Sequence, residues 1–355
     1  MLDRLFSHDL PRSRWLAVIL IAIVVALALT PFLFPGTKAL NVAAKVLVFI
    51  VLVASFDLLL GYTGIVSFAQ TMFFGIGAYG VAIACTRLGP SWGAVALGVA
   101  AALAVSLVLS LVIGLFSLRV KAIFFAMITL AVASAFGTLA SQLSEITGGE
   151  DGLTFKVPAA LQPGTEYASE PFLGASIDGR FLTYYLVFFA ALLLVLALLR
   201  IVNSPFGRVL QAIRENDFRA EAIGYRTVVY RTIASVASAL FATLAGVLLA
   251  LWLRYNGPDT TLSFEIMLDV LLIVVIGGMG TIYGAVVGSV LLVLAQNYLR
   301  DLMKVGAASV QDIPVLSQIV SPDRWLLWLG ILFVLSVYYF PAGVVGRLRT
   351  LGGAK

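Results

Sequence analysis

Residues 92–116 read WGAVALGVAAALAVSLVLSLVIGLF, a stretch that contains no charged side chain. An α-helix of about 20 apolar residues is long enough to cross the hydrocarbon core of a bilayer. A strand of an outer-membrane barrel would instead alternate apolar and polar residues over about 10 positions. This stretch therefore predicts a transmembrane helix.

The rest of the chain repeats this pattern. Hydrophobic residues make up 61% of the 355 positions and charged residues 12%, whereas a soluble domain has about 45–50% and 25%. Nine further windows are apolar enough to span: residues 16–34, 40–60, 64–85, 122–142, 182–200, 229–253, 263–279, 282–299 and 324–340. Because backbone groups in lipid must pair within the protein, we expect an all-α, polytopic transmembrane bundle of about ten spans, with residues 1–355 as one domain.

Basic residues alternate with the spans in a way that predicts orientation. The segment from Arg200 to Arg231 contains six arginines, counting both ends, whereas loop 143–181 has two basic residues and six acidic ones. Loops on the cytoplasmic side of a membrane carry an excess of lysine and arginine. We therefore expect loop 203–228 and both termini in the cytoplasm and loop 143–181 outside. No small-residue cleavage site follows the first window, so we expect that window to be retained as a span.

Two short segments are similar to each other. Residues 89–95 and 280–286 share the pattern Gly-x-x-aromatic-Gly-Ala-Val. They open the fourth and ninth windows, so an offset of five spans would place them in opposite orientations. Inverted repeats of this kind recur in transporters. Coincidence in a chain rich in glycine, alanine and valine is the alternative.

The polar loop 203–228 has a helical pattern of its own. Ser204 and Pro205 are typical of an N-cap and a first helical residue. The apolar residues that follow lie on one helical face: Phe206, Val209, Leu210 and Ile213. Asn216 can cap a second short helix, which Gly224 can end in the left-handed conformation. The loop is too polar to cross a bilayer, so we interpret it as a docking element for a soluble partner.

Glycine and polar residues gather in the third window. Glycine-interrupted helices with polar groups are a good sequence indicator of a transport path. We predict a substrate pathway formed by Asp57, Gly64, Ser67, Gln70, Phe73, Phe74, Gly75, Gly77 and Tyr79, with Asp269 from the eighth window. Simple helix–helix packing through the glycines is the alternative.

Lys45, Asp57 and Asp269 are ionisable residues within or at the edge of the spans, where charge is costly and by default suggests function. We expect Asp57 near the cytoplasmic boundary, where water can solvate it. We expect Lys45 to extend its ammonium outward to the membrane surface. Asp269 is deeper, and either a cavity-lining role or a hydrogen bond to a neighbouring helix would explain it.

Residues for catalysis are missing. The chain contains no G-x-x-x-x-G-K-[ST] phosphate-binding loop and no hydrolase or metalloprotease motif. Its one cysteine, Cys85, and one histidine, His8, exclude an intrachain disulfide and a histidine metal cluster. We expect no enzyme activity, no cofactor and no metal. The net charge of +5 reflects membrane topology and does not indicate nucleic-acid binding.

Five motifs, taken in order, resemble those of the branched-chain amino acid ABC permeases, and most of all their longer, M-type subunit. They are residues 61–79, 147–153, 214–224, 277–284 and 340–343. The third resembles the cytoplasmic coupling loop of ABC importers. The chain departs from many relatives at Gln70, where they have histidine, and at Asp57, where they have asparagine.

The resemblance implies a bacterial inner-membrane permease for branched-chain or similar hydrophobic amino acids. Its implied partners are a second, homologous permease subunit, two cytoplasmic ATPases that hydrolyse ATP, and a periplasmic binding protein. The apolar face of the 205–215 helix would seat in a groove of an ATPase. The implied coupling residues are Phe206, Gly207, Arg208, Ile213, Arg214, Glu215, Glu221, Ala222 and Gly224.

Two alternatives stay open at this point. Related permeases carry urea, short amides or aromatic acids, and the departures at Gln70 and Asp57 leave the substrate undecided. An ion-coupled secondary transporter is the alternative from another class of protein. Such a carrier would usually place several carboxylates in its spans, whereas this chain places essentially two there.

Overall fold

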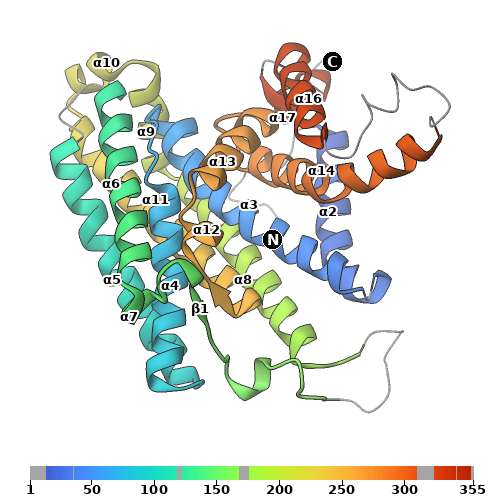
Figure 1. Ribbon diagram of the computed structural model, residues 1–355. Helices are drawn as coiled ribbons and strands as arrows, with labels where there is room; N and C mark the ends of the chain where they lie inside the picture. Colours follow the sequence, from blue (N-terminus) through green and yellow to red (C-terminus); the bar gives the residue numbers. More distant parts are fainter. Residues whose placement is uncertain are drawn as a thin grey trace.

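The computed structural model describes residues 13–34, 36–117, 122–167, 176–309, 324–340 and 342–352. Within them, ten helical segments are long and apolar enough to cross a membrane (Figure 1). In chain order the helices that form these segments are α2 (Arg14–Leu33), α3 (Thr37–Thr63), α4 (Gln70–Leu88), α5 (Trp92–Ser117), α6 (Ala122–Gln142), α8 (Gly179–Val202), α11 (Thr227–Leu253), α12 with α13 (Pro258–Thr261, Phe264–Gly277), α14 (Ile282–Ser309) and α16 with α17 (Trp325–Tyr339, Gly343–Gly352). The predicted polytopic helical bundle is confirmed.

Helix α3 is the centre of the bundle. Most of its residues are buried, and it contacts α8, α11, α13 and α14. A helix that is apolar all round suits such a surrounded position. By contrast, α2, α5, α6 and α16 expose many apolar side chains, among them Ile21, Val108 and Met127. These outer helices present the apolar surface that a bilayer would cover.

Close packing of α4 against α11 depends on two glycines. A Cβ atom on Gly77 would lie 1.9 Å from the carbonyl oxygen of Thr243, and one on Gly246 would lie 1.8 Å from that of Phe74. The absence of side chains lets the two backbones approach, as small residues do in membrane helix pairs. Gly77 therefore has a packing role.

The third span begins later than its window predicts. Helix α3 ends at Gly64, whose φ of 72° is left-handed, and the Ile65 N–H donates to the Leu59 carbonyl at 3.2 Å. Glycine is the residue that most readily adopts this helix-ending conformation. Residues 64–69 are not helical, so the start of window 64–85 is wrong and the span runs from Gln70.

Backbone features support the predicted internal repeat, which stays a prediction. Helices α3 and α11 are both 27 residues long and end at left-handed residues, Gly64 and Arg254. They are the second and the seventh span, which is an offset of five. Gly89 and Gly280 also have similar positive φ angles, 87° and 80°, and each lies just before the helix that the similar segment opens.

Loop 143–181 is folded onto the end of α11. It contains α7 (Ser144–Thr147), η1 (Gly149–Asp151), β1 (Leu153–Thr154) and η2 (Ala159–Leu161). Strand β1 pairs antiparallel with β2 (Tyr255–Asn256), with Leu153 opposite Asn256. Residues 168–175 of this loop, including Glu170, and the two termini at 1–12 and 353–355 lie outside the described residues.

The α4–α11 contact predicts a stability effect. Replacing Gly77 by alanine should lower the free energy of unfolding by about 1–3 kcal/mol, because the new methyl meets backbone that cannot move aside. Thermal unfolding of the purified protein in detergent measures this. Gly137→Ala is the matched control, since a Cβ there meets nothing within 4 Å. Equal melting temperatures for the two variants would contradict the packing role.

Candidate functional site

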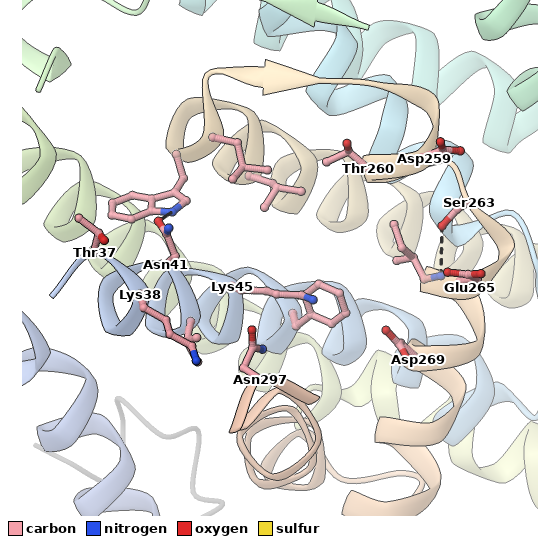
Figure 2. A pocket seen from close by; sticks show the side chains of 16 residues that line it. Thr37, Lys38, Asn41, Lys45, Asp259, Thr260, Ser263, Glu265, Asp269 and Asn297 are labelled. Carbon is pink, nitrogen blue, oxygen red and sulfur yellow. Dashed lines mark hydrogen bonds between the residues drawn. The ribbon is translucent and has the colours of Figure 1, made fainter. Parts of the chain in front are cut away.

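A cavity of about 680 Å³ lies beside the N-terminal half of α3 (Figure 2). Its walls come from α3, the end of α11, α12, α13 and α14. Helix α11 shows at which end of the bundle the cavity lies. The cavity contacts Leu253, the last residue of α11, next to strand β2. The first residue of α11, Thr227, lies at the opposite end of that helix and follows the polar loop. A helix of this length spans roughly 40 Å. The cavity therefore lies at the end of the bundle that carries loop 143–181, opposite the polar loop.

Five charged side chains line the cavity: Lys38 and Lys45 of α3, Asp259 of α12, and Glu265 and Asp269 of α13. Lys45 of α3 is half-buried, and its ammonium lies 5.2 Å from the centroid of the Phe49 ring. No hydrogen bond or ion pair of Lys45 is found in the described part of the chain. We expected this side chain to extend outward to the membrane surface; in the structure it lines the cavity, and the outward extension stays a prediction.

Asp269 of α13 has both of the roles that the sequence left open. It lines the cavity, and its Oδ1 accepts a hydrogen bond from Gln296 Nε2 of α14 at 2.7 Å. The amide fixes one carboxylate oxygen, and the other oxygen makes no hydrogen bond among the described residues. A carboxylate held in this way presents a fixed negative charge to the cavity.

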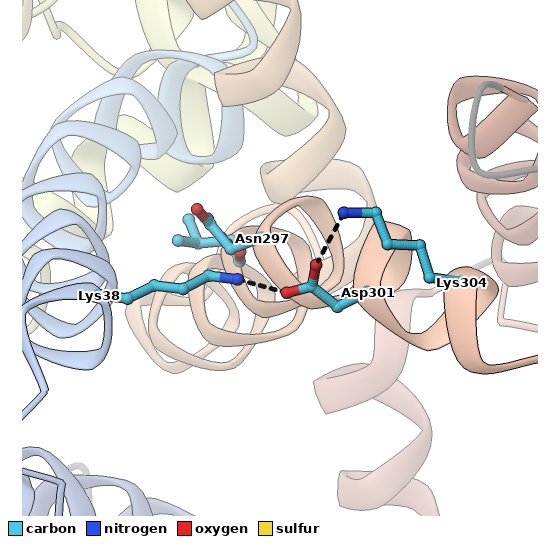
Figure 3. Close-up of polar contacts among 5 residues, drawn as sticks. Lys38, Asn297, Asp301 and Lys304 are labelled. Atoms are coloured by element: carbon cyan, nitrogen blue, oxygen red, sulfur yellow. Dashed lines mark hydrogen bonds and ion pairs between the residues drawn. The ribbon is translucent and has the colours of Figure 1, made fainter.

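The mouth of the cavity is polar as well. Lys38 forms an ion pair with Asp301, whose other oxygen lies 3.9 Å from Lys304 (Figure 3). Exposed ion pairs of this kind contribute little to stability. On the opposite wall, Trp252 Nε1 donates to Asn41 Oδ1 at 3.1 Å, which fixes the indole ring against the cavity.

Most of the predicted pathway residues lie elsewhere. Gln70 is buried and its Nε2 donates to Ser55 Oγ at 2.6 Å and to Ser238 Oγ at 3.2 Å, so it joins α4 to α3 and α11. Among the predicted set only Asp269 lines the cavity. The others that are buried within the packed helices are Asp57, Ser67, Phe73, Phe74, Gly75, Gly77 and Tyr79, while Gly64 is exposed. A route along α4 stays a prediction, separate from this cavity.

A second site joins the polar loop to the spans. The carboxylate of Asp57 is buried, and its Oδ1 accepts the backbone N–H of Gly280 at 2.9 Å, in the turn between α13 and α14. A Cβ on Gly61 would lie 2.3 Å from that same nitrogen. We expected water around Asp57, and that is wrong: close packing excludes water and a backbone donor replaces it.

The polar loop touches this junction through one arginine. Arg214, at the end of α9 (Pro205–Glu215), donates a hydrogen bond to the Gly61 carbonyl. Gly61 therefore lies between Arg214 of the loop and Gly280 of the turn. We call these four residues, Asp57, Gly61, Arg214 and Gly280, the α3 junction.

The caps predicted for the loop are confirmed. Ser204 Oγ accepts from the N–H of Gly207 at the start of α9, and Asn216 Oδ1 accepts from that of Arg219 at the start of α10 (Asp217–Ala222). Gly224 has a φ of 97°. In that region a side chain is strained, so glycine suits the end of this short helix.

The predicted docking face of α9 is wrong. Leu210 and Ile213 are fully buried, and Phe206 stacks on Tyr230 with 5.8 Å between ring centroids. Helix α9 packs against α3, α8 and α11 of its own chain, since burying its apolar stripe there removes it from water. Of the other coupling residues, Gly207 is buried and Glu221 accepts from Thr227, whereas Arg208, Glu215 and Ala222 are exposed.

Apolar side chains that the pattern did not single out are exposed instead. Phe218 of α10 is 83% exposed and Ile223, just after it, is 68% exposed. We call these two residues the loop patch. Both side chains are available for contact with another protein.

Comparison with known proteins places the chain. The family described as "Branched-chain amino acid transport system / permease component" matches residues 38–337. The chain belongs to this family of membrane permeases.

Individual relatives agree. The chain is 27% identical over 322 residues to the high-affinity branched-chain amino acid transport system permease protein LivM of Salmonella typhimurium, covering 86% of this chain and 74% of that protein. The LivM of Escherichia coli gives the same identity and coverage. A probable branched-chain amino acid transport permease protein LivM of Methanocaldococcus jannaschii is 26% identical over 234 residues, 64% of this chain and 61% of that one. No solved structure gives a significant match.

The α3 junction predicts a difference between two substitutions of Asp57. Asp57→Ala leaves the Gly280 N–H without its partner and should destabilise the protein by about 1–3 kcal/mol. Asp57→Asn keeps an oxygen acceptor and should cost less. Thermal unfolding in detergent compares the two variants with the parent. Equal losses for alanine and asparagine would show that the hydrogen bond to Gly280 contributes nothing.

Proposed function

We propose that this chain is the membrane-spanning permease subunit of an ABC importer for branched-chain or similar hydrophobic amino acids. One observation carries the proposal. The polar loop exposes the apolar side chains Phe218 and Ile223, and its Arg214 is hydrogen-bonded to Gly61 of α3, the most buried of the described spans. The chain also lacks a phosphate-binding loop. A permease with a docking loop and no nucleotide site needs ATPases as partners.

The proposed complex contains four kinds of subunit. A second, homologous permease completes the path, two cytoplasmic ATPases hydrolyse ATP, and a periplasmic binding protein delivers the substrate. The loop patch, with Phe218 and Ile223, contacts an ATPase. Loop 143–181, in which Glu150 and Asp151 are exposed, contacts the binding protein. This orientation places the loop of residues 203–228 in the cytoplasm of a bacterial cell and the complex in its inner membrane, as the excess of arginines in that loop favours.

The contacts suggest how ATP hydrolysis moves the substrate. Movement of the docked loop would pull on Gly61 through Arg214, and Asp57 would transmit it to the α13–α14 turn. Helices α3, α13 and α14 also line the cavity at the far end. Substrate access would therefore change with the state of the ATPases, which is gating by a conformational change.

An uptake experiment tests this function against the ion-coupled alternative. The four kinds of subunit, produced together and reconstituted in vesicles, should take up labelled leucine only with ATP inside and the binding protein outside. A protonophore should leave uptake unchanged. Uptake that follows a proton or sodium gradient without ATP would contradict the proposal.

One substitution in the same assay tests the loop patch. Phe218→Asp should weaken ATPase binding by about 10-fold or more, since removing a central aromatic from an interface commonly costs 1.4 kcal/mol or more. Uptake should fall accordingly. The control is Gln211→Ala, an exposed residue on α9 outside the patch. Full ATPase binding by the Phe218 variant would show that the patch is not the docking surface.

A further inference from the structure

The charges around the cavity need an explanation beyond folding. Lys45 and Asp269 belong to spans, where an ionised side chain is costly and almost always faces an aqueous cavity or a partner charge. The two line one cavity, and no ion pair joins them among the described residues. Each therefore has part of its hydrogen-bonding capacity free for a ligand.

The two groups differ in what they can bind. The Lys45 ammonium has only donors, so it can hold a carboxylate. The Asp269 carboxylate has only acceptors when ionised, so it can hold an ammonium. Gln296 occupies Oδ1 of Asp269 and leaves Oδ2 for the cavity. Figure 2 shows the two side chains coming from different helices toward the same cavity.

The remaining walls carry both polar side chains, such as Thr260 and Ser263, and apolar ones. Phe49, Leu249, Trp252 and Ile266 line the cavity beside the charged groups. The Trp252 ring is held in place by Asn41. The volume of about 680 Å³ lies within the roughly 300–1,000 Å³ that is usual for small-molecule sites. It accommodates an amino acid together with water, which suits transient binding.

We propose that this cavity is a low-affinity binding site for a zwitterionic α-amino acid with an apolar side chain, with Lys45 on its carboxylate and Asp269 on its ammonium. The inference rests on the proposed function and specifies which residues meet the substrate. Opposite charges that line one cavity favour this class over urea or a neutral amide, which would leave the charges of Lys45 and Asp269 unmatched. Weak binding is appropriate, because a tightly held substrate would not leave.

Protection of a cysteine from labelling tests the site directly. In the assembled complex without binding protein, Cys85→Ala removes the native thiol and Asn297→Cys places a reporter on the α14 wall of the cavity. The neutral reagent N-ethylmaleimide should react more slowly when millimolar leucine is present. Isocaproate, which lacks the amine, and isoamylamine, which lacks the carboxylate, should each protect less than leucine.

Two charge-removing variants then test the Lys45 ammonium and the Asp269 carboxylate separately. Lys45→Met should abolish protection by leucine and isocaproate and preserve that by isoamylamine. Asp269→Asn should abolish protection by leucine and isoamylamine and preserve that by isocaproate. The matched controls Lys304→Met, an exposed lysine of α14 outside the cavity lining, and Glu145→Gln, an exposed acid of α7 outside it, should keep leucine protection.

The outcomes distinguish this inference from the proposed function. A labelling rate that leucine does not change would overturn the binding site, and so would leucine protection that survives both Lys45→Met and Asp269→Asn. The first result is expected if a side chain of the second permease fills the cavity. If the same complex still performs ATP-driven uptake, the proposed function stands without the site. Absence of ATP-driven uptake by the parent complex would contradict the proposed function itself.

Discussion

The packing of α3 against the α13–α14 turn is the contact on which the rest of the structure depends. Asp57 accepts the Gly280 N–H, Gly61 lies against the same nitrogen, and Arg214 holds the Gly61 carbonyl. Nothing larger than glycine fits at position 61, so the loop and the turn are fastened to one point of one helix. Lys45 lies on that same helix, roughly 18 Å along its axis from Asp57. In the proposed mechanism, this buried helix moves as a unit and so connects the loop to the cavity.

The sequence predicted the features that depend on local chemistry. The spans follow from long apolar windows, and the two short helices of the polar loop begin at Ser204 and Asn216 because these side chains cap free backbone N–H groups. Gly224 ends the second helix because glycine tolerates a positive φ. None of these features needs knowledge of a distant neighbour.

Features that depend on which helices contact each other could not be predicted from the sequence in this way. Helical periodicity shows that α9 has an apolar face, but an apolar face suits a partner protein and the chain's own bundle equally well. The burial of Leu210 and Ile213 shows that this face packs against the chain's own bundle. Likewise, a lysine in a span indicates an energetic cost but not its surroundings, so the cavity beside Lys45 was not predicted. The presence of Lys45 and Asp269 in one cavity could have been predicted, because both were identified as charges in spans.

The glycines of α4 show a related ambiguity. A run of small residues is needed where two helix backbones touch and also where a helix is interrupted for transport. The contact of Gly77 with Thr243 and the hydrogen bonds of Gln70 to Ser55 and Ser238 account for this helix as a packed and polar-bonded core element. The charged cavity lies beside the N-terminal half of α3, where no glycine pattern indicated it.

The central claim is that the loop and the cavity are mechanically connected through α3. Its most direct test is the labelling rate of the Asn297→Cys reporter in the complete complex, compared between the nucleotide-free state and a state trapped with ATP. The account predicts different rates in the two states, and it predicts that Arg214→Ala removes the difference while the ATPases stay bound. Equal rates in both states of the parent complex, or a difference that persists without Arg214, would contradict it.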